Sequence, residues 1–423
     1  MRKTSRYRLL CVGVVLCAVM MLAGPWPPNA LAQGKPIKIG FGMALTGPLG
    51  PNGKAALVAM QIWAEDVNKK GGLLGRKVEL VYYDDQTKPA TIPGIYTKLL
   101  DIDKVDFVVS GYGTNLIAPA IPLVMERGLV FMGLFGLAAN EKFKYDCYFQ
   151  IMPAGPDPRR DWSRGFFEIA VQQNPKPKTI ALVGADAEFA RNAVSGARDN
   201  AKRLGLKIVY DDTWPPGTPD FTPIARAIKA KNPDIVYVGS YPAGSVGFTR
   251  AAHEVGLEPK IMGGGMVGLQ YAAFLTKLGS KLNGIVNYDF WVPEPTLKFP
   301  AIEAFLKKYQ ARAAKVGADP LGHYLPPWAY AYVELLGQAI EGAKSTNQKK
   351  VCEYIRGRTF NTVVGKVKFA PNGEWAKTRT LQVQFQGIKG SDVDQFTKPG
   401  KRVVLYPEEW KSGKVIYPYS KAK

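Results

Sequence analysis

Residues 37–85 read IKIGFGMALTGPLGPNGKAALVAMQIWAEDVNKKGGLLGRKVELVYYDD, and this stretch decides the fold class. Ile37–Phe41 has the apolar composition of a buried strand, and Gly53–Asn68 repeats apolar residues along one helical face. The pair Gly71-Gly72 ends that helix, because glycine adopts the left-handed cap conformation. Val78–Tyr83 is a second strand. The order strand, helix, strand predicts a parallel α/β unit in which the helix covers the sheet.

The same alternation starts afresh after a proline-rich crossing at 153–158. Two series of this kind predict two α/β lobes, each with a parallel sheet and helices on both faces. Further strands are expected at 107–109, 129–132, 179–183, 207–210, 234–238, 260–262, 284–287, 366–369 and 381–385, and further helices at 89–101, 116–127, 301–315 and 327–343.

The N-terminus has the pattern of an export signal. Residues 2–8 carry four basic side chains, residues 9–23 are almost wholly apolar, and 30–32 read ALA. This order predicts a signal peptide over 1–32 that is cleaved between Ala32 and Gln33, and therefore a periplasmic location. A membrane anchor is the alternative, but the apolar run is shorter than the roughly 20 residues that a span needs.

Length and charge limit the class of the mature chain. About 390 residues follow residue 32, which predicts two or more domains. The 56 lysines and arginines exceed the 35 acidic residues and give a net charge of +21. These basic residues are scattered and form no dense run with interleaved aromatics, so we expect no nucleic-acid partner. We interpret the charge as a solvated surface that attracts anionic membranes or anionic solutes.

Cysteine and histidine usage predicts no metal site. Cys147 and Cys352 are the cysteines that remain after signal removal, and an oxidising compartment permits a disulfide between them. Two free buried thiols are an equal alternative, because sequence distance does not give spatial distance. His253 and His323 share no metal-ligand spacing with either cysteine.

Two glycine-rich motifs resemble nucleotide sites only in part. Gly263, Gly265 and Gly268 match G-x-G-x-x-G, and Asp289 lies roughly where a ribose-binding acid would follow. This motif comes late in the second lobe, so we favour a glycine-rich loop that joins a strand to a helix. The run GPLGPNGK at 47–54 lacks the glycine and hydroxyl residue of a phosphate loop and is typical of a strand-to-helix turn.

Motifs for covalent or acid–base catalysis are not found in the sequence. There is no G-x-S-x-G elbow, and neither mature cysteine has a histidine in a known catalytic spacing. Asp84 and Asp85 are adjacent on a strand and point to opposite faces, which favours a structural role. We therefore expect a protein that is not an enzyme and that needs no cofactor.

Gly113-Thr114-Asn115 is the most informative polar site. It ends an expected strand and opens an expected helix, where a hydroxyl and free backbone N–H groups form a corner that suits an anion. Simple N-capping by Thr114 or Asn115 is the alternative, and both roles are compatible. We expect ligand contact here.

Three segments resemble the branched-chain amino acid binding proteins of ABC importers. They are Lys38–Gly47 with Leu45-Thr46-Gly47-Pro48 after the first strand, Asp66–Lys77 with Asn-x-x-Gly-Gly-x-x-Gly-Arg, and Tyr83-Asp84-Asp85. The resemblance continues weakly through Asp234–Tyr237 and spans nearly the whole mature chain. It implies a type I periplasmic-binding fold, in which two doubly wound α/β lobes are joined by three hinge crossings.

The resemblance places these crossings near Ile151, Asp289 and Gly365. Lobe 1 then consists of 33–150 plus 290–364, and lobe 2 consists of 151–289 plus 365–423.

The resemblance also implies a set of ligand-binding residues. Thr114, with Asn115 beside it, falls where the family holds a ligand carboxylate, and Phe135 falls where a backbone carbonyl receives the ligand ammonium. In lobe 2, Phe189 and Tyr241 fall on aromatic positions that close over the ligand.

Two positions depart from the family pattern. Leu137 stands where a threonine normally binds an amino acid, and Gly265 stands where an acid pairs with the ammonium. An ammonium enclosed without its carboxylate is costly. We therefore expect a more apolar pocket that takes an aromatic or aliphatic carboxylate rather than a leucine-type amino acid.

The resemblance predicts a monomeric solute-binding protein that closes its lobes over a small molecule and delivers it to an inner-membrane ABC permease. The ligand class stays open between amino acid-like solutes, aliphatic or aromatic acids, and amides. One alternative is a soluble ligand-sensing component with the same fold. A second is an exported nucleotide-dependent enzyme that uses the loop at Gly263.

Overall fold

The computed structural model describes residues 34–422. The expected signal peptide and its cleavage point therefore lie outside the described residues. Within 34–422, no helix has both the length and the apolar character that a membrane span requires.

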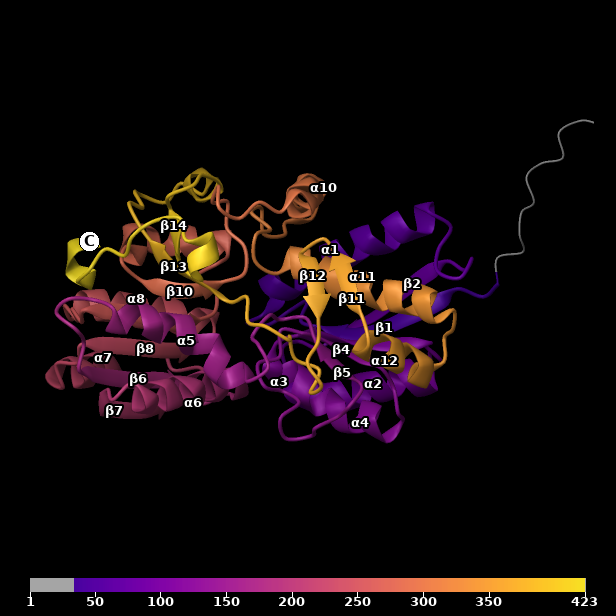
Figure 1. Ribbon diagram of the computed structural model, residues 1–423, viewed down its shortest axis with the longest axis horizontal. Coiled ribbons are helices and arrows are strands. Elements are labelled where there is room, and N and C mark those ends of the chain that lie inside the picture. Colours follow the sequence, from indigo (N-terminus) through magenta and orange to yellow (C-terminus); the bar gives the residue numbers. More distant parts are fainter. Residues whose placement is uncertain (1–33, 423) are drawn as a thin grey trace, which may run out of the picture.

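Two sheets form the centres of two bodies that lie side by side (Figure 1). The first sheet is parallel throughout, with the order β2-β1-β3-β4-β5. Its strands are β1 (Ile37–Met43), β2 (Val78–Asp84), β3 (Phe107–Tyr112), β4 (Phe131–Leu134) and β5 (Tyr148–Gln150). β3 and β4 are buried at every position, as expected for parallel strands that helices cover on both faces.

The second sheet has the order β14-β13-β10-β9-β8-β6-β7. Strands β6 to β10 are parallel, whereas β13 and β14 join antiparallel at one edge. The strands are β6 (Thr179–Ala185), β7 (Lys207–Trp214), β8 (Ile235–Ser240), β9 (Ile261–Met266), β10 (Val286–Asp289), β13 (Leu381–Phe385) and β14 (Arg402–Tyr406). Two series of parallel strands therefore build the two expected α/β units.

Helices connect the strands, and many begin with proline. Pro158, Pro242, Pro300 and Pro326 open α5, α8, α10 and α11, where the missing N–H costs no helical hydrogen bond. The helices are α1 (Gly50–Lys69), α2 (Ile92–Asp101), α3 (Thr114–Ile117), α4 (Ile121–Glu126), α5 (Pro158–Val171), α6 (Glu188–Arg203), α7 (Thr222–Ala230), α8 (Pro242–Glu254), α9 (Ala272–Leu278), α10 (Pro300–Val316), α11 (Pro326–Ala343) and α12 (Gln348–Arg356).

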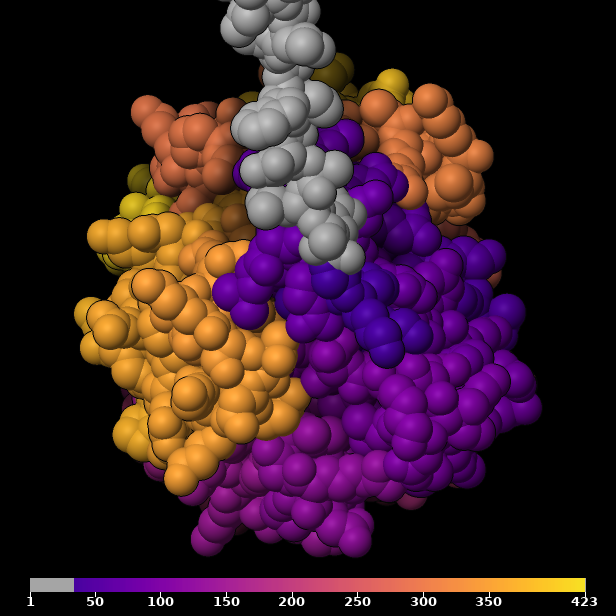
Figure 2. All heavy atoms as spheres, turned by 90° about the vertical axis from the view of Figure 1, so that its right-hand side faces the viewer, coloured from indigo at the N-terminus to yellow at the C-terminus, as the bar shows by residue number. Residues whose placement is uncertain are grey.

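Segments far apart in the sequence complete the first body. α11 packs against α1 and β4, and α10 packs against α1. The hairpin of β11 (Thr359–Thr362) and β12 (Gly365–Lys368) lies against α11. Figure 2 shows these later segments in orange beside the indigo and magenta N-terminal half. A disulfide between Cys147 and Cys352, with a Cα–Cα distance of 5.5 Å, joins the loop before β5 to α12. Of the two possibilities that the sequence left open, a disulfide or two free thiols, the structure has the disulfide.

The structure corrects three details of the expected elements. The region 116–127 is not one helix but α3, a 3-10 turn and α4, because Pro119 and Pro122 interrupt the helical N–H series. The fourth strand lies at 131–134 rather than 129–132. The chain enters the second sheet only at β13, and β12 still pairs with β11, so the last crossing lies later than Gly365.

The glycine motif at 263–268 is the largest correction. Gly263 to Gly265 lie inside β9 rather than in a loop after it. A Cβ on Gly263 would lie 1.6 Å from the carbonyl oxygen of Val286 on β10, and its φ of 155° suits glycine. The glycines therefore permit close approach of two strands, which removes the basis for a nucleotide loop.

Candidate functional site

A small cavity lies where the carboxyl ends of both sheets meet. Tyr112 ends β3, Phe135 follows β4, Tyr241 follows β8 and Val267 follows β9. In open α/β sheets this end of the strands is the usual place for a ligand. The residues that line this inner cavity are Tyr112, Gly113, Thr114, Phe135, Met152, Trp162, Phe189, Tyr241, Val267, Tyr288 and Tyr324. Its volume of about 10 Å³ leaves room for about one water molecule.

The polar corner of the inner cavity is at the start of α3. Gly113 has a φ of 101°, which turns the chain from β3 into the helix. The Thr114 hydroxyl is fully buried and accepts the N–H of Leu137 at 3.0 Å. The N–H groups of Thr114 and Asn115 open the helix and have no acceptor in a preceding turn. This corner can receive a carboxylate by backbone donors.

A glutamine holds the loop after β4 in an uncommon conformation. Phe135 has a φ of 64°, which is left-handed and costly for a residue with a bulky side chain. Its N–H donates to Gln150 Oε1 at 3.0 Å, and Gln150 Nε2 donates to the Gly136 carbonyl at 2.8 Å. Gln150 itself is fully buried. These bonds fix the Phe135 ring at the cavity wall.

The walls are a continuous cluster of aromatic rings from both bodies. The Phe135 ring meets Tyr324 edge-to-face at 5.3 Å between centroids. Trp162 packs on Tyr288 at 4.3 Å and on Phe189 at 5.8 Å, and Phe189 meets Tyr241 at 5.8 Å. Edge-to-face and offset pairs of this kind are favourable beyond their buried area.

The tyrosine hydroxyls of the cavity stay protonated at neutral pH. Burial raises the pKa of Tyr112 to about 12, and it raises the pKa values of Tyr241, Tyr288 and Tyr324 further. The Tyr288 and Tyr324 hydroxyls lie 2.8 Å apart and share one hydrogen bond. The cavity therefore offers neutral hydroxyl groups as hydrogen-bond donors and acceptors.

A buried charged cluster supports the wall from behind. Arg402 on β14 donates to Asp289 Oδ2 at 3.2 Å and contacts His323 Nδ1 at 2.5 Å. Burial and the Arg402 charge lower the pKa of His323 well below its usual value, so the ring is neutral and Nδ1 accepts. Asp289 is therefore engaged by a guanidinium and is not placed as a ribose ligand.

Hydrogen bonds between the two bodies lie around the inner cavity. Asn192 Nδ2 on α6 donates to the Leu137 carbonyl at 2.8 Å, and the Tyr241 hydroxyl donates to Asn115 Oδ1 at 3.2 Å. Arg159 and Glu141 form an ion pair between the same two bodies. These contacts hold the two sheets' carboxyl ends together.

The structure brings most of the expected site residues to one place. Thr114, Phe135, Phe189 and Tyr241 line the inner cavity, and Asn115 borders it through its bond to Tyr241. Leu137 and Gly265 lie one layer behind. Leu137 is buried and takes part through its backbone, and a Cβ on Gly265 would lie 3.6 Å from both Phe189 Cζ and Trp162 Nε1.

Several lining residues were missed by the sequence analysis. Tyr112, Val267 and Tyr288 stand at strand ends, and that position alone was a usable signal. Trp162 lies within α5, and Tyr324 lies in the loop before α11. No local pattern marks these two residues, because only the packing of distant segments brings them to the cavity.

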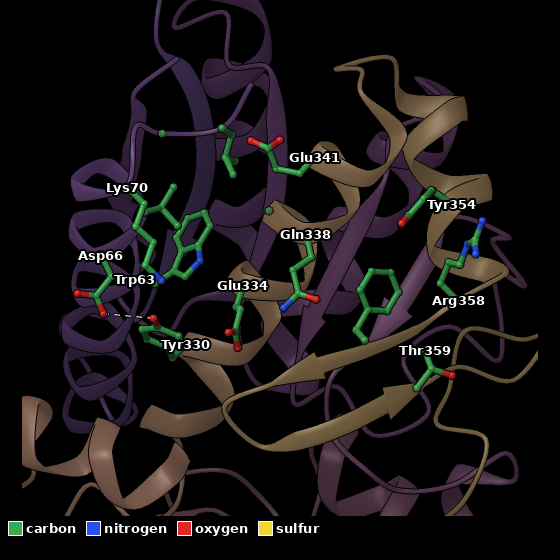
Figure 3. A pocket seen from close by; sticks show the side chains of 15 residues that line it. Trp63, Asp66, Lys70, Tyr330, Glu334, Gln338, Glu341, Tyr354, Arg358 and Thr359 are labelled. Carbon is green, nitrogen blue, oxygen red and sulfur yellow. Dashed lines mark hydrogen bonds between the residues drawn. The ribbon is translucent and has the colours of Figure 1, made fainter. Parts of the chain in front are cut away.

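A larger hollow on the first body is a less suitable site. It has a volume of about 680 Å³ and lies between α1, α11, α12 and β11 (Figure 3). Its acidic groups are already engaged: Asp66 accepts from Tyr330 and Lys308, and Glu334 accepts the Val363 N–H at 2.8 Å. It takes no residue from the second sheet, so closure of the two bodies cannot act on its contents.

Comparison with known proteins identifies the family. Residues 36–389 match the family model described as periplasmic binding protein. The chain belongs to the periplasmic binding protein family. This assignment covers most of the chain and confirms the family resemblance of its N-terminal motifs. It also places the protein among solute-binding proteins rather than enzymes.

Named relatives and solved structures agree with this family. A leucine-, isoleucine-, valine-, threonine- and alanine-binding protein of Pseudomonas aeruginosa is 25% identical over 360 residues, which are 85% of this chain and 92% of the relative. The structure of a branched-chain amino acid transporter substrate-binding protein from Streptococcus pneumoniae, in complex with isoleucine, has a TM-score of 0.70 at 20% identity and covers 88% of this chain and 100% of its own.

A solute-binding protein of an ABC transporter from Rhodopseudomonas palustris HaA2, in complex with p-hydroxybenzoic acid, has a TM-score of 0.72 at 20% identity. The match covers 90% of this chain and 97% of that one. The expected type I periplasmic-binding fold is thus confirmed for this member of the family.

Proposed function

We propose that this periplasmic binding protein is the extracytoplasmic component of an ABC importer, which captures a small carboxylate-type solute and delivers it to a membrane permease. The observation that carries the proposal is the inner cavity, which joins the carboxyl ends of both sheets. Thr114 comes from the first body, whereas Phe189 and Tyr241 come from the second. A solute in this place contacts both bodies at once.

The chemistry of the walls favours an aromatic or aliphatic carboxylate over a leucine-type amino acid. Among the described residues that line the inner cavity, none carries a carboxylate that would neutralise an ammonium. An unpaired ammonium enclosed there costs several kcal/mol. A carboxylate has donors in the N–H groups of Thr114 and Asn115, and the apolar atoms next to the carboxylate meet the aromatic walls.

Lobe closure is the proposed means of capture. We propose lobe 1 as 33–150 plus 290–368 and lobe 2 as 151–289 plus 381–423, because β12 pairs with β11 whereas β13 pairs with β10 of the second sheet. A ligand that contacts both lobes stabilises the closed form by its differential affinity for that form. The closed form then presents a composite surface to the permease.

Export and oligomeric state complete the proposal. The sequence of residues 1–32 supports export to the periplasm with cleavage before Gln33, and the matched family model is described as periplasmic binding protein. We propose that the mature protein acts as a monomer, because both lobes of the cavity come from one chain.

A thermal-shift screen of the mature protein tests the proposed ligand class. We expect aliphatic or aromatic monocarboxylates to raise the melting temperature most, because a ligand at 100 times its Kd stabilises by about 2.7 kcal/mol. Amino acids, amides and urea are screened in parallel. If leucine or valine gives the largest shift, the proposed ligand class is wrong. If a compound is consumed with turnover, the binding function itself is wrong.

Thr114→Ala is expected to weaken binding of the best ligand at least about tenfold and to lower the free energy of unfolding by about 1–3 kcal/mol. The substitution leaves the buried Leu137 N–H without its acceptor and disturbs the polar corner. Calorimetric titration and urea unfolding measure the two effects. Thr114→Ser keeps the hydroxyl and is the matched control. Wild-type affinity in Thr114→Ala would remove Thr114 from the site.

A further inference from the structure

A second, larger cavity lies between the lobes, directly outside the inner one. Its volume is about 530 Å³, which is within the range of small-molecule sites. Pro48, Leu49 and Pro119 contribute its lobe 1 wall, and Trp214 and Phe221 contribute its lobe 2 wall. We call it the outer cavity.

One residue borders both cavities. Tyr241 lines both of them, and its hydroxyl donates to Asn115 Oδ1 at 3.2 Å across the lobe boundary. Thr114 lines the inner cavity, and the next residue, Asn115, lines the outer one. Because Tyr241 is common to both linings, a rotation of its ring that breaks this hydrogen bond would open a path between the two spaces.

The outer cavity is apolar and its lobe 2 wall is well packed. Trp214 is only 3% exposed; its ring meets Phe221 edge-to-face at 5.2 Å and stacks on Phe248 at 6.1 Å. Two charged residues also line the cavity, Glu188 and Arg191. Arg191 forms an ion pair with Asp186 at 2.7 Å, and burial raises the pKa of the Glu188 carboxyl, so a bound anion gains no free cation there. The space suits a hydrocarbon chain or ring rather than a second ionic group.

The two cavities differ in size and therefore suit different parts of one ligand. The inner cavity has room for about one water molecule beside Thr114, which suits a polar head and not a bulky body. The outer cavity has the volume and the apolar walls that such a body needs. We propose that the outer cavity is a second subsite, which holds the apolar tail of an elongated monocarboxylate whose head lies at Thr114. This inference rests on the proposed binding function and names the class of solute more narrowly.

Titration calorimetry of the mature protein with straight-chain monocarboxylates from propanoate to decanoate tests the inference. Affinity is expected to rise about fourfold for each added methylene, well past the chain length of leucine, because each buried methylene contributes a constant transfer free energy. An affinity that peaks at short acids and then falls overturns the second subsite and leaves the proposed function intact. If no acid of any length binds, the proposed ligand class fails as well.

A matched pair of variants locates the tail. Ala243 and Ala301 are both exposed, and each follows a proline at the start of a helix, α8 and α10 respectively. Ala243 lines the outer cavity, whereas Ala301 lies outside both the inner and the outer cavity. We expect Ala243→Trp to weaken the affinity for the longest acids at least tenfold, so that affinity no longer rises with chain length. The affinity for propanoate should stay as in the wild type. Ala301→Trp should leave the whole series unchanged. Equal weakening of short and long acids by Ala243→Trp overturns the assignment of the tail to this cavity.

Discussion

Arg402→Met is expected to lower the free energy of unfolding by about 3–5 kcal/mol at neutral pH, because the buried Asp289 carboxyl loses its cation and has to stay charged alone or take up a proton. Arg402 and Asp289 are each 1% exposed, and the guanidinium is the cation that contacts this carboxylate in the described structure. The arginine also bonds His323 Nδ1 at 2.5 Å. Urea unfolding of the mature protein measures the loss.

The size of this loss should depend on pH in a defined direction. Burial raises the pKa of Asp289 to about 6 even with Arg402 beside it, and removal of Arg402 raises it further. An unfolded aspartate has a pKa of about 3.9. The folded variant therefore holds a proton that the unfolded chain has released, so its stability is greatest below about pH 4 and falls as the pH rises through the raised pKa. We expect a smaller deficit at pH 5 than at pH 8.

The double variant Arg402→Met, Asp289→Leu is the control for a charge effect. It removes both partners, and replacement of a buried ion pair by apolar residues is often neutral. We expect it to recover most of the lost stability. A single variant that unfolds within about 1 kcal/mol of wild type would show that the pair is not buried as described.

This charged cluster also bears on the site. Asp289 ends β10, and the next residue, Phe290, stands at the crossing between the lobes, with its ring 4.8 Å from that of Phe135 and parallel to that of Tyr324 at 5.8 Å. We therefore expect Arg402→Met to weaken the best ligand even where the variant is folded, because the aromatic wall loses its fixed support.

Loss of the disulfide is expected to lower the free energy of unfolding by about 2–4 kcal/mol. Cys147 and Cys352 are 205 residues apart, so the bond closes a long loop and restricts the unfolded chain strongly. The bond also joins α12 to the loop before β5. Both segments belong to the first body, but between them the chain passes through the second body.

Urea unfolding with and without reductant measures this contribution. The variant Cys147→Ser, Cys352→Ser should match the reduced wild type and should be insensitive to reductant, which separates the bond from any other effect of the reagent. Equal stability of oxidised and reduced wild type would contradict the predicted contribution.

The sequence predicted those strands, helices and turns that depend on residues close together along the chain. The strand, helix and strand at 37–85 appear as β1, α1 and β2 within a few residues of the expected bounds. Apolar runs and glycine stops are properties of neighbouring residues, so their effect does not depend on the rest of the chain. The polar corner at Thr114 was found in the same way, as a hydroxyl between a strand and a helix.

The same local signals failed where a distant strand decides the structure. Considered alone, the three glycines 263–265 favour a loop. In the structure all three pair with β8, and the first two also pair with β10, so β9 continues through them. The close approach of Val286 to Gly263 comes from a strand more than twenty residues away along the chain. No property of 263–265 alone contains that information.

By itself, the sequence determined the two α/β series, and its resemblance to a known family implied Thr114, Phe135 and Tyr241 as site residues. Only the tertiary structure decided that Cys147 pairs with Cys352, that Trp162 and Tyr324 complete the inner cavity, and that an outer cavity lies beyond Tyr241. The physical reason is the range of each effect. Propensity and hydrophobic periodicity act over a few turns, whereas a cavity between lobes exists only after segments hundreds of residues apart have packed together.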